Sequence, residues 1–387
     1  MKVSSGVNNS MRTKVLIIGA GPAGSMAAYR LASAGFRDFI LADRSDFPRM
    51  KPCAGGIAPS SIRFLRKMGM EDLPAGLKPN APMRRVRFVG PGGRDIIMTT
   101  GLKAMTVNRR IFDAALLDRA RSLGARFIPG FTVRELLLDG RGRVVGARDG
   151  DRSIEAEVTI LANGGRNREF RERYFADRRP LRLIASRIGW WRNFDIEEGT
   201  MEMVFDRDLL PHYGWVFPEG DGMVNIGICL YQDRLRGRNV ADVFDEFLEK
   251  HYARRLKEAE RAGKSYSFVI NTAGSVKDVY ARGMLCAGEA ARLCNPATAE
   301  GISYAMESGV LAADAVMKAY DGSRGGIPDE RSLEEYEAMC RRAFNFRLRR
   351  AALFRNMINS PLFNLMISLS TTKWSRRVID RLFVNAD

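Results

Sequence analysis

The sequence predicts an α/β fold in which a three-layer, Rossmann-like domain with a parallel sheet carries an inserted antiparallel-sheet domain and a helical carboxyl-terminal region. Three observations predict it. A strand, a glycine-rich turn and an alanine-rich helix follow one another over residues 14–35. A strand, a loop and a long helix return at residues 283–320. Between these segments, residues 180–232 contain stretches that alternate between apolar and polar positions, as antiparallel strands do.

The first segment has the pattern of a nucleotide-binding turn. Residues 15–18 form a branched apolar run that suits a buried parallel strand, and the helix of residues 25–34 ends before Gly35. In such a turn, one glycine permits the sharp bend, one leaves room for a pyrophosphate, and one lets the helix pack on the strand. The free N–H groups of the helix start would face the pyrophosphate. The residues of this turn are Gly19, Gly21, Pro22, Ala23 and Gly24.

A second strand with an acid at its end strengthens this prediction. Residues 39–42 form an apolar run that is followed by Asp43 and Arg44. Asp43 comes about 20 residues after the last glycine of the turn, where a carboxylate that binds ribose belongs. A lone glycine motif is weak, but strand, turn, helix, strand and acid in this order predict a dinucleotide site.

The second glycine-rich segment resembles the distal loop and helix by which one flavoprotein superfamily contacts its flavin. It contains Gly288 and Glu289, continues through Pro296, and opens a helix at Gly301 and Ile302. Glu289 would accept hydrogen bonds from ribityl or ribose hydroxyls. The N–H groups at the helix start could face the carbonyls of the flavin ring. The two segments together imply FAD, with its pyrophosphate on the first and its ring near the second.

Composition limits the class of protein. The chain has 387 residues, 45% of them hydrophobic, and a net charge of +17. The apolar runs are too short to span a membrane, and the polar residues 1–11 predict a disordered start without a signal peptide. The five cysteines include no CxxC pair, which favours a reducing cytoplasm and no metal site. No nucleic-acid-binding motif accompanies the basic charge, so phosphorylated partners or an anionic membrane stay open.

The loop of residues 51–56 is one of the segments by which the chain resembles a known family. The chain resembles the geranylgeranyl reductase family of FAD-dependent oxidoreductases, in the p-hydroxybenzoate hydroxylase-like superfamily, over residues 12–320. Lys51-Pro-Cys53-Ala54-Gly55-Gly56 is similar to the family's KPCGGG-like loop beside the flavin ring. By this resemblance Arg109 contacts the cofactor and Val133 offers backbone contacts to adenine. Ala162 and Gly164 also lie near the cofactor, although Asn163 replaces the family's usual aspartate.

The segment from Tyr213 to Pro218 resembles the family's YxWxFP motif, which lines the substrate cavity. Strand alternation puts Tyr213, Trp215 and Phe217 on one face, where they could flank a flavin or a polyene chain. The preceding proline is one position closer than in many relatives, and most relatives carry Gly-Asp in place of Gly288-Glu289. The glutamate keeps the carboxylate but extends its reach.

The resemblance implies hydride transfer from flavin N5 to an unactivated carbon–carbon double bond of a geranylgeranyl-type isoprenoid or lipid. The protein would then supply proximity and a dry apolar cavity. Cys53 is the candidate for protonation near the flavin, and His212 is a second candidate acid that could equally be structural. No second glycine motif binds NAD(P)H, so the electron donor is open between NAD(P)H and a ferredoxin-like carrier.

Two other classes of function stay open. One is a flavin-dependent monooxygenase or halogenase that acts on a small aromatic or polyketide-like substrate. The other is a non-enzymatic flavin-binding protein. The Cys53 loop and the aromatic motif fit the reductases better, since halogenases resemble a GWxWxIP pattern that residues 213–218 do not meet.

The predicted domains follow from these motifs. The FAD-binding domain comprises residues 12–170 and 272–325, and strands near 84–100 contribute to the substrate side. Residues 171–271 form the antiparallel substrate domain, and residues 326–387 form the helical region. Residues 341–355 contain six arginines and no acid on a helix with an apolar face. Such a helix could lie on the inner face of the cell membrane or cap the substrate cavity.

Overall fold

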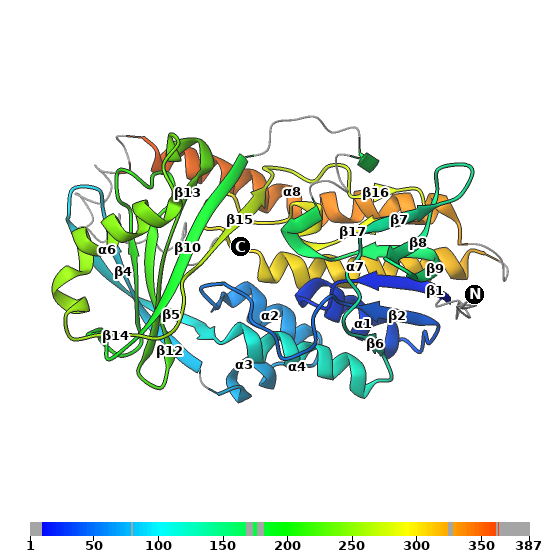
Figure 1. Ribbon diagram of the computed structural model, residues 1–387, viewed down its shortest axis with the longest axis horizontal. Coiled ribbons are helices and arrows are strands. Elements are labelled where there is room, and N and C mark those ends of the chain that lie inside the picture. Colours follow the sequence, from blue (N-terminus) through cyan, green and yellow to red (C-terminus); the bar gives the residue numbers. More distant parts are fainter. Residues whose placement is uncertain are drawn as a thin grey trace, which may run out of the picture.

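The computed structural model describes residues 10–78, 80–167, 173–175, 182–323, 328–360 and Phe363. Two sheets with their helices lie next to each other along the longest axis of the molecule (Figure 1). The elements follow in chain order as β1 (Ser10–Ile18), α1 (Pro22–Ser33), β2 (Phe39–Ala42), β3 (Gly56–Ile57), α2 (Pro59–Lys67), α3 (Asp72–Gly76), β4 (Asn80–Val89), β5 (Asp95–Val107), α4 (Arg109–Ser122), β6 (Arg126–Ile128), β7 (Glu135–Leu138), β8 (Val144–Asp149), β9 (Arg152–Leu161), η1 (Gly164–Asn167), β10 (Arg182–Arg192), β11 (Thr200–Val204), β12 (Gly214–Gly220), β13 (Met223–Tyr231), η2 (Gln232–Leu235), α6 (Val240–Leu256), β14 (Glu260–Arg261), β15 (Tyr266–Thr272), β16 (Tyr280–Ala281), β17 (Met284–Cys286), η3 (Gly288–Ala291), α7 (Ile302–Asp321) and α8 (Glu330–Ile358).

The first sheet has the parallel core that the sequence predicts. Its strand order is β16-β17-β9-β1-β2-β6, and β1 pairs in parallel with both β2 and β9. The antiparallel strands β7 and β8 join through β9. Val15, Leu16 and Ile17 of β1 have no exposed surface, because a central parallel strand is covered on both faces. The predicted α/β fold class is confirmed.

Helices α1 and α7 pack unusually closely beside this sheet. A Cβ atom on Gly309 of α7 would lie 2.0 Å from the carbonyl oxygen of Ala23 in α1. A Cβ on Gly24 would lie 1.8 Å from the carbonyl oxygen of Gly19. Glycine at position 24 therefore lets α1 pack on its own turn, and glycine at position 309 lets the returning carboxyl-terminal segment lie directly against the amino-terminal nucleotide unit. The same contact brings the two glycine-rich segments together.

The second sheet is mostly antiparallel, with one exception to the expectation. Its strand order is β14-β10-β13-β12-β11-β4-β5-β3, and β15 also pairs with β10. The pair β11–β4 is parallel. Parallel pairing needs a long connection, and these strands are separated by the whole segment from β5 to β10. Strands β4 and β5 extend over residues 80–107, well beyond the predicted runs.

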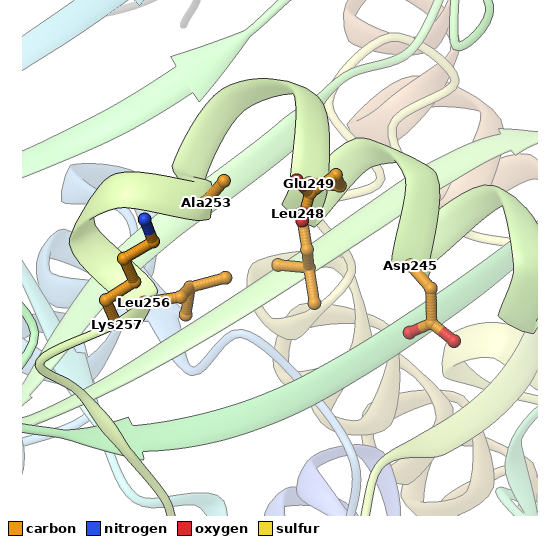
Figure 2. Close-up of a pocket in the computed structure, with 6 residues that line it drawn as sticks. All are labelled: Asp245, Leu248, Glu249, Ala253, Leu256 and Lys257. Carbon is orange, nitrogen blue, oxygen red and sulfur yellow. The ribbon is translucent and has the colours of Figure 1, made fainter.

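Helix α6 covers one face of the second sheet. Val216, Ile226 and Ile228 point to this face and pack with Phe244 and Phe247 of the helix. One flank of α6 carries an open depression (Figure 2). Its lining comes from α6 and the residue that follows it, and includes Asp245, Glu249 and Lys257. The depression contains none of the predicted site residues.

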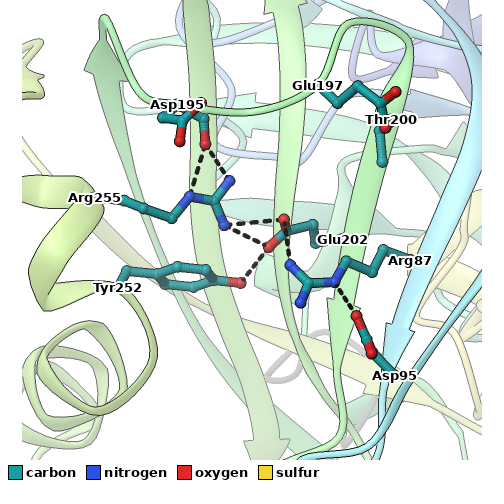
Figure 3. A network of polar contacts seen from close by, with 8 residues as sticks. All are labelled: Arg87, Asp95, Asp195, Glu197, Thr200, Glu202, Tyr252 and Arg255. Carbon is teal, nitrogen blue, oxygen red and sulfur yellow. Dashed lines mark hydrogen bonds and ion pairs between the residues drawn. The ribbon is translucent and has the colours of Figure 1, made fainter.

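A buried polar network fixes α6 to the sheet (Figure 3). Arg255 Nη1 donates to both carboxylate oxygens of Glu202, at 2.9 and 3.0 Å, and Tyr252 donates to Oε2 at 3.1 Å. Arg87 of β4 reaches the same carboxylate at 3.4 Å and pairs with Asp95 at 2.6 Å. Glu202 is only 4% exposed, so these partners are needed to compensate its lost hydration. The opposite face of the sheet is thus the one left for a ligand.

Several element boundaries differ from the predicted ones. Helix α1 begins at Pro22 rather than residue 25, because proline suits the first helical position. Strand β7 begins at Glu135, two positions after Val133, so Val133 precedes the strand. In the predicted helical region, the structure describes helix α8 over residues 330–358. The predictions for residues 1–9 and 364–387 lie outside the described residues, and the predicted domain boundaries stay predictions.

Candidate functional site

The glycine turn after β1 forms a cradle at the start of α1. Gly19 has φ of +100°, and a Cβ there would lie 2.5 Å from the carbonyl oxygen of Ala162. A Cβ on Gly21, in contrast, would meet only Arg49 Nη2, at 3.6 Å. No side chain caps α1 at Gly21, so the first N–H groups of the helix are available to an anion. This arrangement fits a pyrophosphate.

Asp43 lies at the end of β2, beside this turn. Its Oδ2 accepts a hydrogen bond from Ala20 N at 2.7 Å, and its Oδ1 accepts one from Ser45 N at 2.9 Å. The Asp43 carbonyl oxygen accepts from Phe131 N at 2.9 Å, which brings the half-buried Val133 to the same edge. The predicted ribose and adenine residues therefore lie together, while Arg44 is exposed.

The cysteine loop packs against the second sheet. Gly55 has φ of +73°, and a Cβ there would lie 2.3 Å from the carbonyl oxygen of Val107. Gly55 N donates to Cys53 Sγ at 3.5 Å. A Cβ on Gly56 would lie 3.5 Å from the ring of Phe217. Cys53 is partly exposed, whereas the other four cysteines are buried. The loop thus brings the accessible thiol to the aromatic strand.

A buried cluster of charges lies beside Cys53. Arg109 donates to both oxygens of Asp113, at 2.8 and 3.0 Å, and Arg49 Nη2 lies 3.5 Å from the same carboxylate. Burial would lower the pKa of Arg109, but Asp113 and the Cys53 sulfur raise it well above its usual value. Arg109 is therefore already paired within the protein. Arg49, which lies next to Gly21, is a candidate site residue that the sequence did not predict. Its position just before the cysteine loop was the one signal that could have indicated it.

Glu289 has a different setting from the one expected. Its Oε1 accepts a hydrogen bond from Asn271 N at 3.3 Å. A Cβ atom on Gly165 would lie only 2.3 Å from the same oxygen, so glycine there leaves room for the carboxylate. Burial raises the pKa of Glu289, while Lys51 and backbone N–H groups oppose the rise. The carboxylate thus joins β15, η1 and η3 through the protein backbone. Its contact with cofactor hydroxyls stays a prediction.

The start of α7 faces the aromatic strand. Gly301 caps the helix without a side-chain hydrogen bond, and Ile302 begins it. The preceding loop, which contains Pro296, is tied to the second sheet because Tyr213 donates to the carbonyl oxygen of Thr298 at 2.7 Å. Gly288 N donates to Ser308 Oγ at 2.8 Å, and a Cβ on Gly288 would lie 3.1 Å from Ala23. Both glycine-rich segments therefore converge on α1.

A polar network behind the aromatic residues was not predicted. Asn225 Nδ2 donates to the carbonyl oxygen of Ala54 at 3.0 Å and to Glu219 Oε1 at 2.8 Å. Asn225 Oδ1 accepts from Trp215 Nε1 at 2.7 Å, and Trp190 Nε1 donates to Glu219 at 2.8 Å. Burial raises the pKa of Glu219, although the hydrogen bonds from Trp190 and Asn225 oppose the rise. The alternation that places Tyr213, Trp215 and Phe217 on one face of the strand extends to Glu219. This spacing is the signal from which Glu219 could have been predicted as part of the site.

His212 lies at the other end of this face. It has no exposed surface, and its ring meets Tyr231 edge-on with centroids 4.6 Å apart. Burial lowers the pKa of His212 to about 4. The carbonyl oxygen of Ala297 opposes this shift, and the positive charge of Arg355 adds to it. The neutral ring is therefore the form at physiological pH, which argues against the expected role as an acid.

In residues 10–360, gaps excepted, no group of histidine, cysteine and acidic side chains is arranged to hold a metal ion. Within the same described ranges, no helix combines the length and apolar character needed to cross a membrane.

The parallel sheet, the uncapped glycine cradle and the second glycine loop before α7 define an FAD-dependent oxidoreductase. The residues present fit the dinucleotide, because only glycine at position 21 leaves the helix start open. The chain belongs to the FAD binding domain family, whose profile matches residues 12–351, and within it to the geranylgeranyl reductases.

Similar proteins cover most of the chain. Digeranylgeranylglycerophospholipid reductase 2 of Methanopyrus kandleri is 27% identical over 91% of this chain and 89% of its own length. Menaquinone reductase of Mycolicibacterium smegmatis is 30% identical over 82% of this chain and 78% of its own. The crystal structure of a geranylgeranyl bacteriochlorophyll reductase-like protein from Thermoplasma acidophilum matches with a TM-score of 0.83 at 20% identity, covering 97% and 98% of the two chains, and so supports the fold.

Proposed function

We propose that this protein reduces carbon–carbon double bonds in the geranylgeranyl-type chain of a lipid. The observation that carries the proposal is the hydrogen bond from Asn225 to Ala54, which holds the Cys53 loop against the aromatic strand. The names of the relatives support a prenylated lipid as substrate. When bound, FAD supplies the hydride that such a reduction needs.

The protein's own residues provide a dry, apolar surface. Tyr213, Trp215 and Phe217 are each less than 10% exposed and belong to one buried cluster with Trp190. Such a surface can hold a polyene chain by apolar contact and exclude water from the reacting carbons. Cys53 Sγ is the accessible group beside this row that can hold a proton. We therefore assign the protonation step to Cys53.

We assign cofactor binding to the two glycine segments and the loops around them. The start of α1 at Gly21 would hold the pyrophosphate, with Arg49 as the adjacent cation. Asp43 would bind the ribose, and the start of α7 at Ile302 would face the flavin ring. These residues come from opposite ends of the chain, and the close packing of α1 on α7 supports this assignment.

Anaerobic single turnover tests this function. The FAD-loaded protein is reduced with dithionite, mixed with a geranylgeranylated lipid, and followed by flavin absorbance and by mass spectrometry of the lipid. Reoxidation without oxygen, with a gain of two hydrogen atoms per reduced bond, supports the proposal. A product that forms only with oxygen or halide would instead establish the monooxygenase or halogenase class.

We also propose that α8 places the protein on an anionic membrane. Phe346 and Leu353 of this helix are 69% and 70% exposed, one heptad apart. Arg342 and Arg349 are exposed on the same side. Apolar side chains that alternate with arginines suit the interface of an anionic bilayer, where the prenylated substrate resides.

The electron donor is a separate question within this proposal. The net charge of +17 favours an acidic carrier of the ferredoxin type, while NADH or NADPH could bind transiently without a domain of their own. Anaerobic mixing of the oxidised protein with each donor distinguishes them by the rate of flavin bleaching. Strong salt dependence would favour the acidic carrier.

A further inference from the structure

An unusual group of cations and polar atoms surrounds Tyr231, at the end of β13. The His212 ring packs on Tyr231 with centroids 4.6 Å apart. The guanidinium carbon of Arg182 lies 5.6 Å from the centre of the Tyr231 ring, and that of Arg355 lies 6.0 Å from it. Strands β10 and β13, helix α8 and the turn before β12 therefore all contribute one side chain to this cluster.

The three buried members of this cluster, His212, Tyr231 and Arg355, lack the partners that burial normally requires. The hydroxyl of Tyr231 and both ring nitrogens of His212 are buried, and none makes a hydrogen bond of normal geometry among the described residues. The carbonyl oxygen of Ala297 lies near the His212 ring but outside that geometry. Arg355 is 9% exposed, and its polar partner in the described part of the chain is the neutral amide oxygen of Asn356, at 3.0 Å. A buried cation and three unpaired polar atoms are costly without a ligand.

The charges in the cluster specify the sign of that ligand. Within the described ranges, the side-chain contacts of Arg182 and Arg355 are with the Tyr231 ring and the Asn356 amide, and no carboxylate is among them. Two other arginines of this fold have a carboxylate partner: the buried Arg109 is paired with Asp113, and the half-buried Arg255 with Glu202. Guanidinium groups that lack a carboxylate, together with a phenol and an imidazole that can donate, suit an oxyanion such as phosphate.

The position of the cluster connects it to the proposed reaction. Asn225, which holds the cysteine loop, and Tyr231 point to the same face of β13, since they are separated by an even number of positions. Six residues of extended strand span about 20 Å. Trp215 and Tyr213 lie between the two ends, on the same face. A long prenyl chain could therefore extend from the cysteine loop to the arginines.

We propose that Arg355, Arg182, His212 and Tyr231 form a binding site for the phosphate of an anionic lipid headgroup. This inference rests on the proposed function, and it deepens it, because it selects a prenylated glycerophospholipid over a neutral prenyl quinone as the substrate class. The relatives' names include both classes. His212 then contributes to substrate binding rather than to proton transfer.

Nuclear magnetic resonance of the histidine rings tests the site directly. The chain has two histidines, so His212 and His251 can be resolved after selective nitrogen-15 labelling. Titration of the FAD-loaded protein with glycerol 1-phosphate should shift the His212 ring signals, and glycerol should not. His251, which pairs with Asp206 at 2.6 Å, serves as the internal control. Unmoved His212 signals would overturn the site.

Substitution of the arginines tests the role of the headgroup. Arg355→Gln should raise KM for geranylgeranylglycerol phosphate by about tenfold or more and leave KM for uncharged geranylgeranylglycerol unchanged. Arg182→Gln, at an exposed position, provides the same test should the first variant fail to fold. Arg331→Gln, exposed at the far end of α8, removes an equal charge and should change neither KM.

The outcomes separate this inference from the proposed function. If neither lipid is reduced but glycerol phosphate still shifts His212, the proposed function fails and the anion site stands. If both lipids are reduced with the same KM in wild type and both variants, the headgroup assignment is wrong. Glycerol phosphate binding without any effect on lipid KM would likewise overturn it, because the site would then serve a free phosphate.

Discussion

Asn225 donates a hydrogen bond of 3.0 Å to the carbonyl oxygen of Ala54, the residue next to Cys53. The second proton on the same nitrogen goes to Glu219, and the amide oxygen accepts from Trp215. One side chain of the second sheet thus uses both of its N–H donors and also accepts one hydrogen bond. It fixes the cysteine loop to the aromatic strand across 171 residues of sequence.

Asn225→Ala should impair both stability and turnover. The change leaves the Ala54 carbonyl and the indole N–H of Trp215 unpaired, so the free energy of unfolding should fall by about 2–4 kcal/mol. The cysteine loop would also lose its position, and kcat should fall by about 10- to 100-fold. Urea unfolding and anaerobic turnover measure the two effects. Glu219→Gln is the control, because an amide oxygen can still accept from Trp190 and Asn225; a full loss of turnover there would assign the carboxyl itself a role.

Cys53→Ala should retain bound FAD and lose most turnover. The side chain lies in the loop of Gly55 rather than in the glycine cradle, and its removal takes away the accessible proton beside the aromatic row. A loss of kcat of about 100-fold or more is expected for a missing proton donor. Cys53→Ser, which keeps a hydroxyl proton, should be less impaired. Unchanged turnover in the alanine variant would remove Cys53 from the mechanism.

Gly21→Val should give a folded protein that does not bind FAD. A Cβ at this position meets only Arg49, at 3.6 Å, so the fold tolerates the side chain, which instead occupies the space of the pyrophosphate. The measurements are the melting temperature of the apoprotein and the flavin absorbance after reconstitution. Gly76→Val, at an exposed helix end with open space around it, should stay yellow. A yellow Gly21→Val protein would refute the placement of the pyrophosphate.

Stability should depend on pH through Asp206. Burial alone would raise the pKa of Asp206, but hydrogen bonds from His251, Lys250 and the N–H of Asp208 lower it well below its ordinary value. A depressed carboxyl pKa stabilises the folded state above the unfolded pKa of about 3.9, and this contribution is lost as pH falls below it.

Asp206→Asn should therefore cost about 1.5–3 kcal/mol at pH 7, and the difference from wild type should shrink by pH 3. Chemical unfolding at the two pH values measures this. Asp221→Asn, at an exposed turn position with φ of 51°, should change little at either pH, since asparagine tolerates that conformation. A constant difference between wild type and Asp206→Asn across this range would contradict the assignment.

The double variant Phe346→Glu with Leu353→Glu should weaken membrane binding. Both side chains are exposed on α8, so the fold should be unaffected, while the acids are repelled by an anionic bilayer. Co-sedimentation with phosphatidylglycerol vesicles should fall by about tenfold. Ile97→Glu, on the exposed side of β5, controls for a general change of charge. Equal binding by both proteins would place the membrane contact elsewhere.

Local chemistry made the nucleotide half of this molecule predictable. The turn around Gly21, the acid at Asp43 and the strand alternation from Tyr213 to Phe217 are short-range patterns with one favoured structure each. The confirmed α/β fold class and the dinucleotide site followed from them, and FAD followed when the resemblance of the second glycine-rich segment to a flavin-contacting loop was added. The cysteine loop was found through resemblance, because a glycine-rich loop has no periodicity of its own.

By itself, the sequence determined the Rossmann unit, FAD as the cofactor and the residues of the aromatic face. Only the tertiary structure decided that Asn225 reaches Ala54, that Arg49 lies beside Gly21, and that Arg355 and His212 both lie against the Tyr231 ring. These contacts join segments far apart in the chain, so they depend on strand register and helix packing rather than on neighbouring residues. The same packing turns Glu289 onto the backbone of Asn271, where its added methylene can be accommodated.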